Sequence, residues 1–251
     1  MVCCSEAPRS GRAMTGETFI RRLELIGHLD DGDRQALRAM AGEFREIGRG
    51  AQLISVGDRP SHVVGIVTGL LHRFTVTEDG ERQIHAFYLP TDVPSADTLH
   101  MPVMDTAMSA AVPSRIVLVE HAEMLAMLSQ RPNIRDLLWR ETLVQASMFR
   151  TWLMRNSQMI AEVRMAHLFC ELFWRARAAG ADSNGSLSFP VSREDLSAAL
   201  GMTTVQANRT LKLLEDTGAV KLTHGMLSLN DPEQLKNFAQ FDPSYLHLRP
   251  R

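Results

Sequence analysis

The feature that most constrains this chain is residues 192–220, which read as two short helices joined by a tight turn. Ser192 is a good N-cap for the first helix, because its hydroxyl can accept a hydrogen bond from a free amide of the first turn. Gly201 lies at the turn, where crossed helices usually need a positive φ or a close backbone approach. Thr203 or Thr204 can cap the second helix. The pattern therefore predicts a helix-turn-helix.

The second helix has an inward and an outward side and is expected to end at Gly218. The apolar residues expected to face inward are Val205, Leu211 and Leu214, with Ala207 as a further candidate. The polar residues expected to face outward are Gln206, Asn208, Arg209 and Lys212. Hydroxyl, amide and guanidinium groups are thus gathered near the start of the helix, where a recognition helix meets base edges.

Residues 220–229 follow this helix and read as two short strands around a turn at His224-Gly225. A helix-turn-helix followed by a hairpin is a winged helix. An ordinary αα-hairpin is the alternative, because that motif is common in helical proteins. The gathered polar groups and the hairpin argue against it.

Composition limits what else the chain can be. Its 251 residues are 45% hydrophobic and 22% charged, which suits a globular protein of two domains. The net charge of −2 means that any DNA binding must come from a local basic patch. No apolar run approaches the length of a membrane span, and the first residues lack the apolar core of a signal peptide. Three cysteines cannot form a disulfide framework, so we expect a cytoplasmic protein with no membrane partner.

The N-terminal half combines two helices with a series of short strands. Residues 1–16 are expected to be frayed and flexible, with Cys3 and Cys4 as bystanders. Residues 17–26 and 33–41 read as short amphipathic helices. The β-rich runs that follow, separated by Gly/Asp turns, are 52–56, 62–67, 70–76, 83–89, 106–112 and 115–120. Such runs predict a small sandwich or jelly-roll barrel.

Pro132 suits the first turn of a long helix that could extend from Asn133 to about Ser157. Its apolar stripe consists of Ile134, Leu138, Val144, Met148, Trp152 and Met159, widened by Leu137, Phe149 and Leu153. A stripe that wide needs both the barrel and a partner helix, so a homodimer of parallel helices is the economical solution. The alternative is a helix buried within one subunit, and Glu141 and Gln145 interrupt the stripe.

The C-terminal part contains two further helices. Residues 161–179 read as a helix in which Cys170 is a small core residue. Asp231 is placed to cap a final short helix. The tail from Phe241 is expected to be loose.

The order of these parts resembles the Crp/Fnr family of bacterial transcription regulators. The most specific match is LSAALGMTTVQANRTLKLLE, residues 196–215. The resemblance implies an α+β fold with an N-terminal β jelly-roll like a cyclic-nucleotide-binding domain, a long dimerisation helix and a C-terminal winged helix-turn-helix. The boundaries that it implies are a flexible N-terminus 1–16, a sensor domain 17–130, a dimerisation helix 131–160 and a DNA-binding domain 161–251.

The resemblance also implies how the second helix would contact DNA. Arg209 stands where the family has an arginine that reads guanine, and Asn208 or Gln206 would add an amide contact. Thr203, Thr204 and Lys212 would contact phosphates, which set register but carry no sequence information. Val205 replaces a glutamate of the better-known members. A carboxylate can accept from cytosine N4, whereas valine can only touch a thymine methyl.

The sensor departs from the family's cyclic-nucleotide binders. Residues 93–99 replace their Gly-Glu cassette, and Asp105 stands in place of the arginine that neutralises the cyclic phosphate. An aspartate would repel that phosphate, so we expect no binding of cyclic AMP or cyclic GMP in the family's mode. The barrel histidines, His62, His72, His85 and His100, form no pair at helical i, i+4 spacing. No cofactor or metal site is therefore predicted.

These observations favour a sequence-specific DNA-binding transcription regulator over an enzyme. We expect it to bind double-stranded DNA at a pseudo-palindromic promoter site as a homodimer, and to contact RNA polymerase if it is an activator. Regulation would rotate the winged helices about residues 154–160. One alternative is a cupin-like metal enzyme, whose His/Glu ligand cluster is not found. Another is a dimerisation module with a non-functional winged helix.

Overall fold

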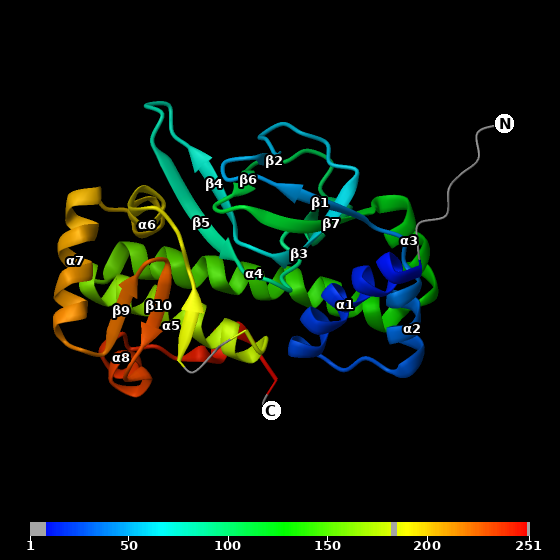
Figure 1. Ribbon diagram of the computed structural model, residues 1–251. Helices are drawn as coiled ribbons and strands as arrows, with labels where there is room; N and C mark the ends of the chain where they lie inside the picture. The colour runs from blue at the N-terminus through cyan, green and yellow to red at the C-terminus, as the bar shows by residue number, and fades with distance from the viewer. Residues whose placement is uncertain (1–8, 182–184, 250–251) are drawn as a thin grey trace.

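A long helix, α4 (Pro132–Gln158), separates a β-sandwich on one side from a C-terminal winged helix on the other (Figure 1). The computed structural model describes residues 9–181 and 185–249. Cys3 and Cys4 lie outside the described residues. Cys170 is fully buried, as predicted for a core residue.

The chain begins its ordered structure earlier than expected. Helix α1 (Arg9–Ile26) starts well inside the segment predicted to be frayed, and Thr15 is fully buried. A Cβ at Gly16 would lie 2.5 Å from the carbonyl oxygen of Leu37, so α1 and α2 (Asp31–Ala39) cross in close contact there. Helix α1 thus begins within the segment that the sequence predicted to be frayed, and its close packing on α2 at Gly16 stabilises a stretch whose own helical pattern is weak.

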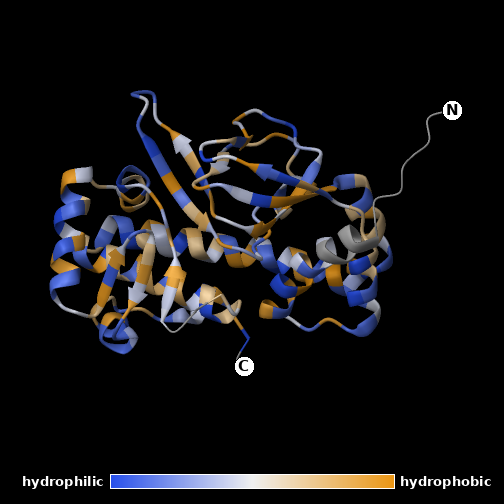
Figure 2. Ribbon diagram, in the orientation of Figure 1, coloured by the Kyte–Doolittle hydropathy of each residue, from blue (hydrophilic) through white to orange (hydrophobic). Residues whose placement is uncertain are grey.

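The strands form two antiparallel sheets that face each other. One has the order β1-β7-β3, from Glu43–Ile47, Ser114–Glu120 and His62–Thr68. The other has the order β2-β6-β4-β5, from Gln52–Ile54, Ala107–Ala110, Leu71–Val76 and Arg82–Tyr88. The strand β5 alternates between hydrophilic and hydrophobic residues at its start and becomes hydrophobic toward its end (Figure 2). The predicted sandwich is confirmed; β1, which carries three charged residues, was the strand not individually predicted.

Helix α4 follows the short helix α3 (His121–Gln130) and has two apolar faces rather than one wide stripe. The inner face, which includes Ile134, Leu138, Val144, Met148 and Trp152, is buried within the subunit. Glu141 and Gln145 are buried on this face too, so they do not interrupt it. A separate outer face exposes large apolar side chains, with Trp139 67% and Leu153 72% exposed.

The C-terminal region is built on α5 (Ala161–Ala178). Its other elements are β8 (Ser186–Ser188), α6 (Arg193–Leu200), α7 (Thr204–Asp216), β9 (Val220–Thr223), β10 (Met226–Leu229), α8 (Pro232–Phe238) and a 3-10 turn, η2 (Pro243–Leu246). The three strands pair in the order β8-β10-β9, which gives the predicted winged helix. The prediction of a loose tail from Phe241 is wrong, because Phe241 and Leu246 are buried and anchor the last residues on the protein.

Candidate nucleic-acid interface

The turn between α6 and α7 is fixed by three local devices that the sequence predicted. The Ser192 hydroxyl accepts a hydrogen bond from the amide of Asp195 at 3.0 Å and caps α6. Gly201 ends α6 in the left-handed region, at φ +59. The Thr203 hydroxyl accepts from the amide of Gln206 at 3.2 Å and caps α7. The two hydroxyl caps give a hydrogen-bond partner to a backbone amide at the start of each helix. Glycine adopts the positive φ without the strain that a side chain would cause.

Helix α7 buries one side and presents the other. Ala207, Leu211 and Leu214 are buried as expected, together with Thr210. Val205 is 81% exposed, so its predicted place on the inner side is wrong. The reason is the helical period: residues 207, 210, 211 and 214 already form the buried stripe, and residue 205 lies on the opposite side of the first turn.

The outward face of α7 is centred on Arg209, with Val205 one turn before it and Lys212 nearly one turn after it. Gln206 and Asn208 are exposed beside Arg209. None of these polar side chains has a hydrogen bond or ion pair within the described part of the chain. Thr203 and Thr204 lie at the amino end of the helix, where the backbone dipole favours a phosphate.

The wing is tied to the recognition helix by contacts that were not predicted. The Glu215 carboxylate accepts a hydrogen bond from the amide of Leu222 at 2.9 Å, which joins α7 to β9. The turn between β9 and β10 places His224 at φ +51 and Gly225 at φ +75, as a tight hairpin turn requires. A Cβ at Gly225 would lie 2.7 Å from the Cβ of Pro190, so glycine is needed for space as well as for φ.

The helix-turn-helix is also held by the β-sandwich, a second contact that the sequence did not predict. Asp195 of α6 forms an ion pair with Arg82 of β5, and Arg49 lies 3.8 Å from its other oxygen. The Gln83 amide donates to the carbonyl oxygen of Ala198 at 2.7 Å. These groups fasten α6 to the β4–β5 hairpin and so fix where α7 points.

Residues 93–99, the segment expected to replace the family's Gly-Glu cassette, form contacts within the protein. Arg73 of β4 donates to both carboxylate oxygens of Asp97, at 2.6 and 3.2 Å, and to the carbonyl oxygen of Pro94. This ion pair borders a cavity of about 630 Å³ between the sandwich and α4, which Asp105 also lines. Among the described residues, Arg73 and His85 are the basic side chains that line it. Burial lowers the pKa of His85, so its imidazole is neutral near pH 7.

Three of the barrel histidines, His62, His72 and His85, lie within hydrogen-bond distance of a hydroxyl. The His72 imidazole is buried against the Ser109 hydroxyl at 2.8 Å, and burial lowers its pKa to about 4. His85 pairs with Thr75 at 2.9 Å. Within the residues that the structure describes, no group of three or more His, Cys, Asp or Glu could hold a metal ion. No helix in these ranges is long and apolar enough to cross a membrane.

A capped helix-turn-helix, a three-stranded wing and an exposed polar face on the second helix define a winged-helix DNA-binding protein. A Crp-like helix-turn-helix domain matches residues 163–238. The chain is 25% identical over 204 residues to the nitrogen fixation regulation protein FixK of Bradyrhizobium diazoefficiens, covering 78% of this chain and 84% of that one. It is 25% identical over 213 residues to the transcriptional activator FnrL of Cereibacter sphaeroides, covering 82% and 84%.

The solved structures agree with this relation at the level of the fold. FixK2 from Bradyrhizobium japonicum superposes with a TM-score of 0.72 at 22% identity, over 79% of this chain and 98% of that one. The Crp-like helix-turn-helix domain, these relatives and the shared fold support a transcription regulator of the Crp/Fnr family. These similarities to transcription regulators do not favour the two alternatives, a cupin-like metal enzyme and a dimerisation module with a non-functional winged helix.

Proposed function

We propose that this regulator binds a pseudo-palindromic promoter site as a homodimer and inserts α7 of each subunit into a major groove. The observation that carries the proposal is the outward face of α7, a helix capped by Thr203, where Arg209, Gln206 and Lys212 are exposed and have no partner among residues 9–181 and 185–249. Side chains that have no partner in the free protein are available to base edges and phosphates. The two half-sites would lie about one helical turn apart.

Within that face the residues would divide by role. Arg209 would read guanine bidentately, and Gln206 or Asn208 would add an amide contact. Val205 is exposed enough to touch a thymine methyl. Thr203, Thr204 and Lys212 would bind phosphates and set the register. We keep residues 17–130, 131–160 and 161–251 as the proposed division into sensor, dimerisation helix and DNA-binding domain.

The outer face of α4 supports the homodimer. Trp139, Leu143 and Leu153 are exposed at positions that a heptad spacing of four and three places on one seam. Large apolar side chains along one helix face are costly to leave in water and suit pairing with a second copy. We expect Leu153→Asp to yield monomers in sedimentation velocity, whereas Leu125→Asp on α3, also at an exposed leucine, should remain dimeric. A dimeric Leu153→Asp protein would contradict this interface.

The DNA contact is tested by selecting binding sites from random duplex DNA with the whole protein. Replacement of Arg209 by Ala should weaken binding to the selected site by about 1–3 kcal/mol and relax preference at one position. Arg38→Ala is the matched control, because Arg38 is an exposed arginine on α2, far from α7 (Figure 1). An unchanged affinity and footprint for Arg209→Ala would overturn the assignment.

We also propose that neither cyclic AMP nor cyclic GMP binds in the family's mode. Arg73 in the cavity is already neutralised by Asp97, and Asp105 adds a second negative charge. A cyclic phosphate entering there would have to displace a bidentate ion pair. Calorimetry that gave micromolar affinity for either nucleotide would contradict the proposal. We place the protein in the cytoplasm, where an activator of this type would also contact RNA polymerase.

A further inference from the structure

Residues 239–249 follow α8, the last helix of the winged helix, and extend back to α1, the first helix of the chain. We call these residues the C-terminal strap. Ala239, Phe241 and Leu246 of the strap are buried. The turn η2 packs against both α4 and α5. The strap therefore crosses the junction between α4 and α5, the two helices that join the winged helix to the rest of the protein.

At the winged-helix end the strap is held by aromatic contacts and one partly buried hydrogen bond. The ring of Phe241 packs edge-on against His167 and lies 5.3 Å from the ring of Trp174, both on α5. The ring of Tyr245 stacks on His167 at 5.9 Å. The Tyr245 hydroxyl donates to the Glu171 carboxylate at 2.8 Å. Buried aromatic pairs and a bond to a carboxylate make this end firm.

At the other end Arg249 ties the strap to α1 by hydrogen bonds, and Leu248 beside it packs partly against the core. The Arg249 amide donates to the carbonyl oxygen of Leu25 at 2.8 Å, and its guanidinium donates to the carbonyl oxygen of Gly27 at 2.7 Å. These carbonyls lie at the carboxyl end of α1, where they lack partners within the helix and where a cation is favoured. The winged helix is thereby tied to the N-terminal part of the chain.

The α4–α5 junction contains a buried charge that is only partly compensated, because the Arg155 Nε donates to the Asn156 side-chain oxygen at 3.5 Å and Glu171 supplies a favourable charge. Arg155 is completely buried, and neither of its Nη atoms has a hydrogen-bond partner among the described residues. Its guanidinium lies over the Trp152 ring, 4.3 Å from the centroid. Burial lowers the pKa of Arg155 to about 10. A buried charge whose two Nη groups have no hydrogen-bond partner among the described residues is unfavourable, so opening this junction to water would recover hydration that the closed arrangement has lost.

We propose that the C-terminal strap is a releasable tie that restrains the winged helix. With the strap docked, Arg249 and η2 hold the winged helix against α1 and α4. With the strap released, Arg155 becomes hydrated and the winged helix can turn about the residues between α4 and α5. This tie is separate from DNA recognition, since no strap residue belongs to the outward face of α7.

Hydrogen–deuterium exchange of the full-length protein tests the tie without attachment of a probe to the protein. The reporters are two amides at the α4–α5 junction, Met159, which donates to Arg155, and Arg164, which donates to Ile160. In Arg249→Ala these amides should exchange about tenfold faster, because a charge-assisted hydrogen bond no longer opposes opening. A chain ended after Gln240 should show a larger increase.

The matched control is Ser244→Ala, since the one partner of the Ser244 hydroxyl among the described residues is Asp242, inside the strap. It should exchange like the parent protein. Amides of the β3–β7 ladder report whether a variant is folded; if the shortened chain loses their protection, Arg249→Ala alone decides. Junction amides of Arg249→Ala that exchange within twofold of the parent, in a protein with an intact ladder, would overturn the proposal.

Discussion

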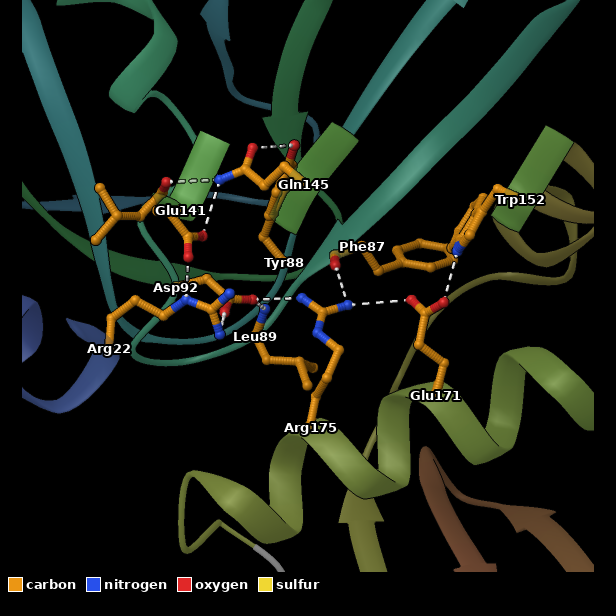
Figure 3. Close-up of polar contacts among 11 residues, drawn as sticks. Arg22, Phe87, Tyr88, Leu89, Asp92, Glu141, Gln145, Trp152, Glu171 and Arg175 are labelled. Carbon is orange, nitrogen blue, oxygen red and sulfur yellow. Dashed lines mark hydrogen bonds and ion pairs between the residues drawn. The ribbon is translucent and has the colours of Figure 1, made fainter. Parts of the chain in front are cut away.

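The guanidinium of Arg175 on α5 lies 2.6 Å from the carboxylate of Asp92, in the loop that leaves the β-sandwich. The other oxygen of Asp92 lies 3.4 Å from Arg22 of α1, which also donates to Glu141 of α4 at 2.8 Å. All these side chains are almost completely buried, and Figure 3 shows the polar contacts that link them. One carboxylate thus joins the first helix, the sandwich loop and the winged helix, and the Glu171 carboxylate continues the network.

The first prediction concerns removal of that carboxylate. Asp92→Ala should lower the free energy of unfolding by about 3–5 kcal/mol, because Arg22 and Arg175 would keep buried charges without their shared partner. Urea denaturation followed by fluorescence measures it. Asp136→Ala is the control, because the Arg135–Asp136 pair is exposed and should change stability by no more than about 0.5 kcal/mol. A similar small change in both variants would show that the network is dispensable.

The second prediction separates backbone strain from lack of space at the wing. Gly225 and Gly80 both have φ near +80, but a Cβ at Gly80 meets nothing within 4 Å, whereas one at Gly225 meets Pro190. Gly80→Ala should cost about 1 kcal/mol from φ alone. Gly225→Ala should cost more, because the wing must also move away from Pro190. Thermal unfolding of the two variants gives the comparison, and equal costs would mean that the wing adjusts freely.

The elements that the sequence predicted well are those fixed by local chemistry. Ser192, Gly201 and Thr203 perform the capping and turn roles expected of them, because a cap or a left-handed glycine depends on a few neighbouring backbone atoms. Likewise, the His224-Gly225 turn follows from its own backbone angles. The polar residues of the family motif are exposed on α7, as expected. Val205 is exposed too, because the helical period puts it on the side opposite the buried residues.

The elements that were missed depend on residues far apart in the sequence. Nothing near Asp195 indicates that Arg82 will pair with it, and nothing near Phe241 indicates that the tail will find α5. Glu141 looked like a break in an apolar stripe because its partner, Arg22, lies in another helix. Such contacts are set by the tertiary fold, and a pattern of period two or 3.6 carries no information about them.

The third prediction is a loss of stability in mild acid. Burial lowers the pKa of His167 to about 3, and its ordinary value is 6.5. The unfolded chain therefore binds a proton below pH 6.5 that the folded protein excludes until about pH 3, so the stability is complete above 6.5 and falls with pH across that window. At pH 5 the neutral, buried His167 should lower the free energy of unfolding by about 2 kcal/mol relative to its value above pH 6.5. In His167→Phe the loss of unfolding free energy between pH 7 and pH 5, measured by urea denaturation at each pH, should be smaller by that amount. An unchanged loss would contradict the role of His167.

The last prediction concerns the base that residue 205 reads. Val205 is exposed one turn before Arg209, at the position where better-known members of the family have a glutamate. In Val205→Glu the new carboxylate can accept from cytosine N4, so sites selected from random DNA should gain a cytosine at the base pair next to the guanine read by Arg209. Val205→Ala is the control, because it removes the methyl contact and adds no acceptor, and it should weaken preference without creating a new one. Discrimination for cytosine should be worth about 1–3 kcal/mol, measured by competition between duplexes that differ at that base pair. If Val205→Glu selects the same sites as the parent protein, residue 205 does not reach the bases, and α7 must enter the groove rotated toward Gln206.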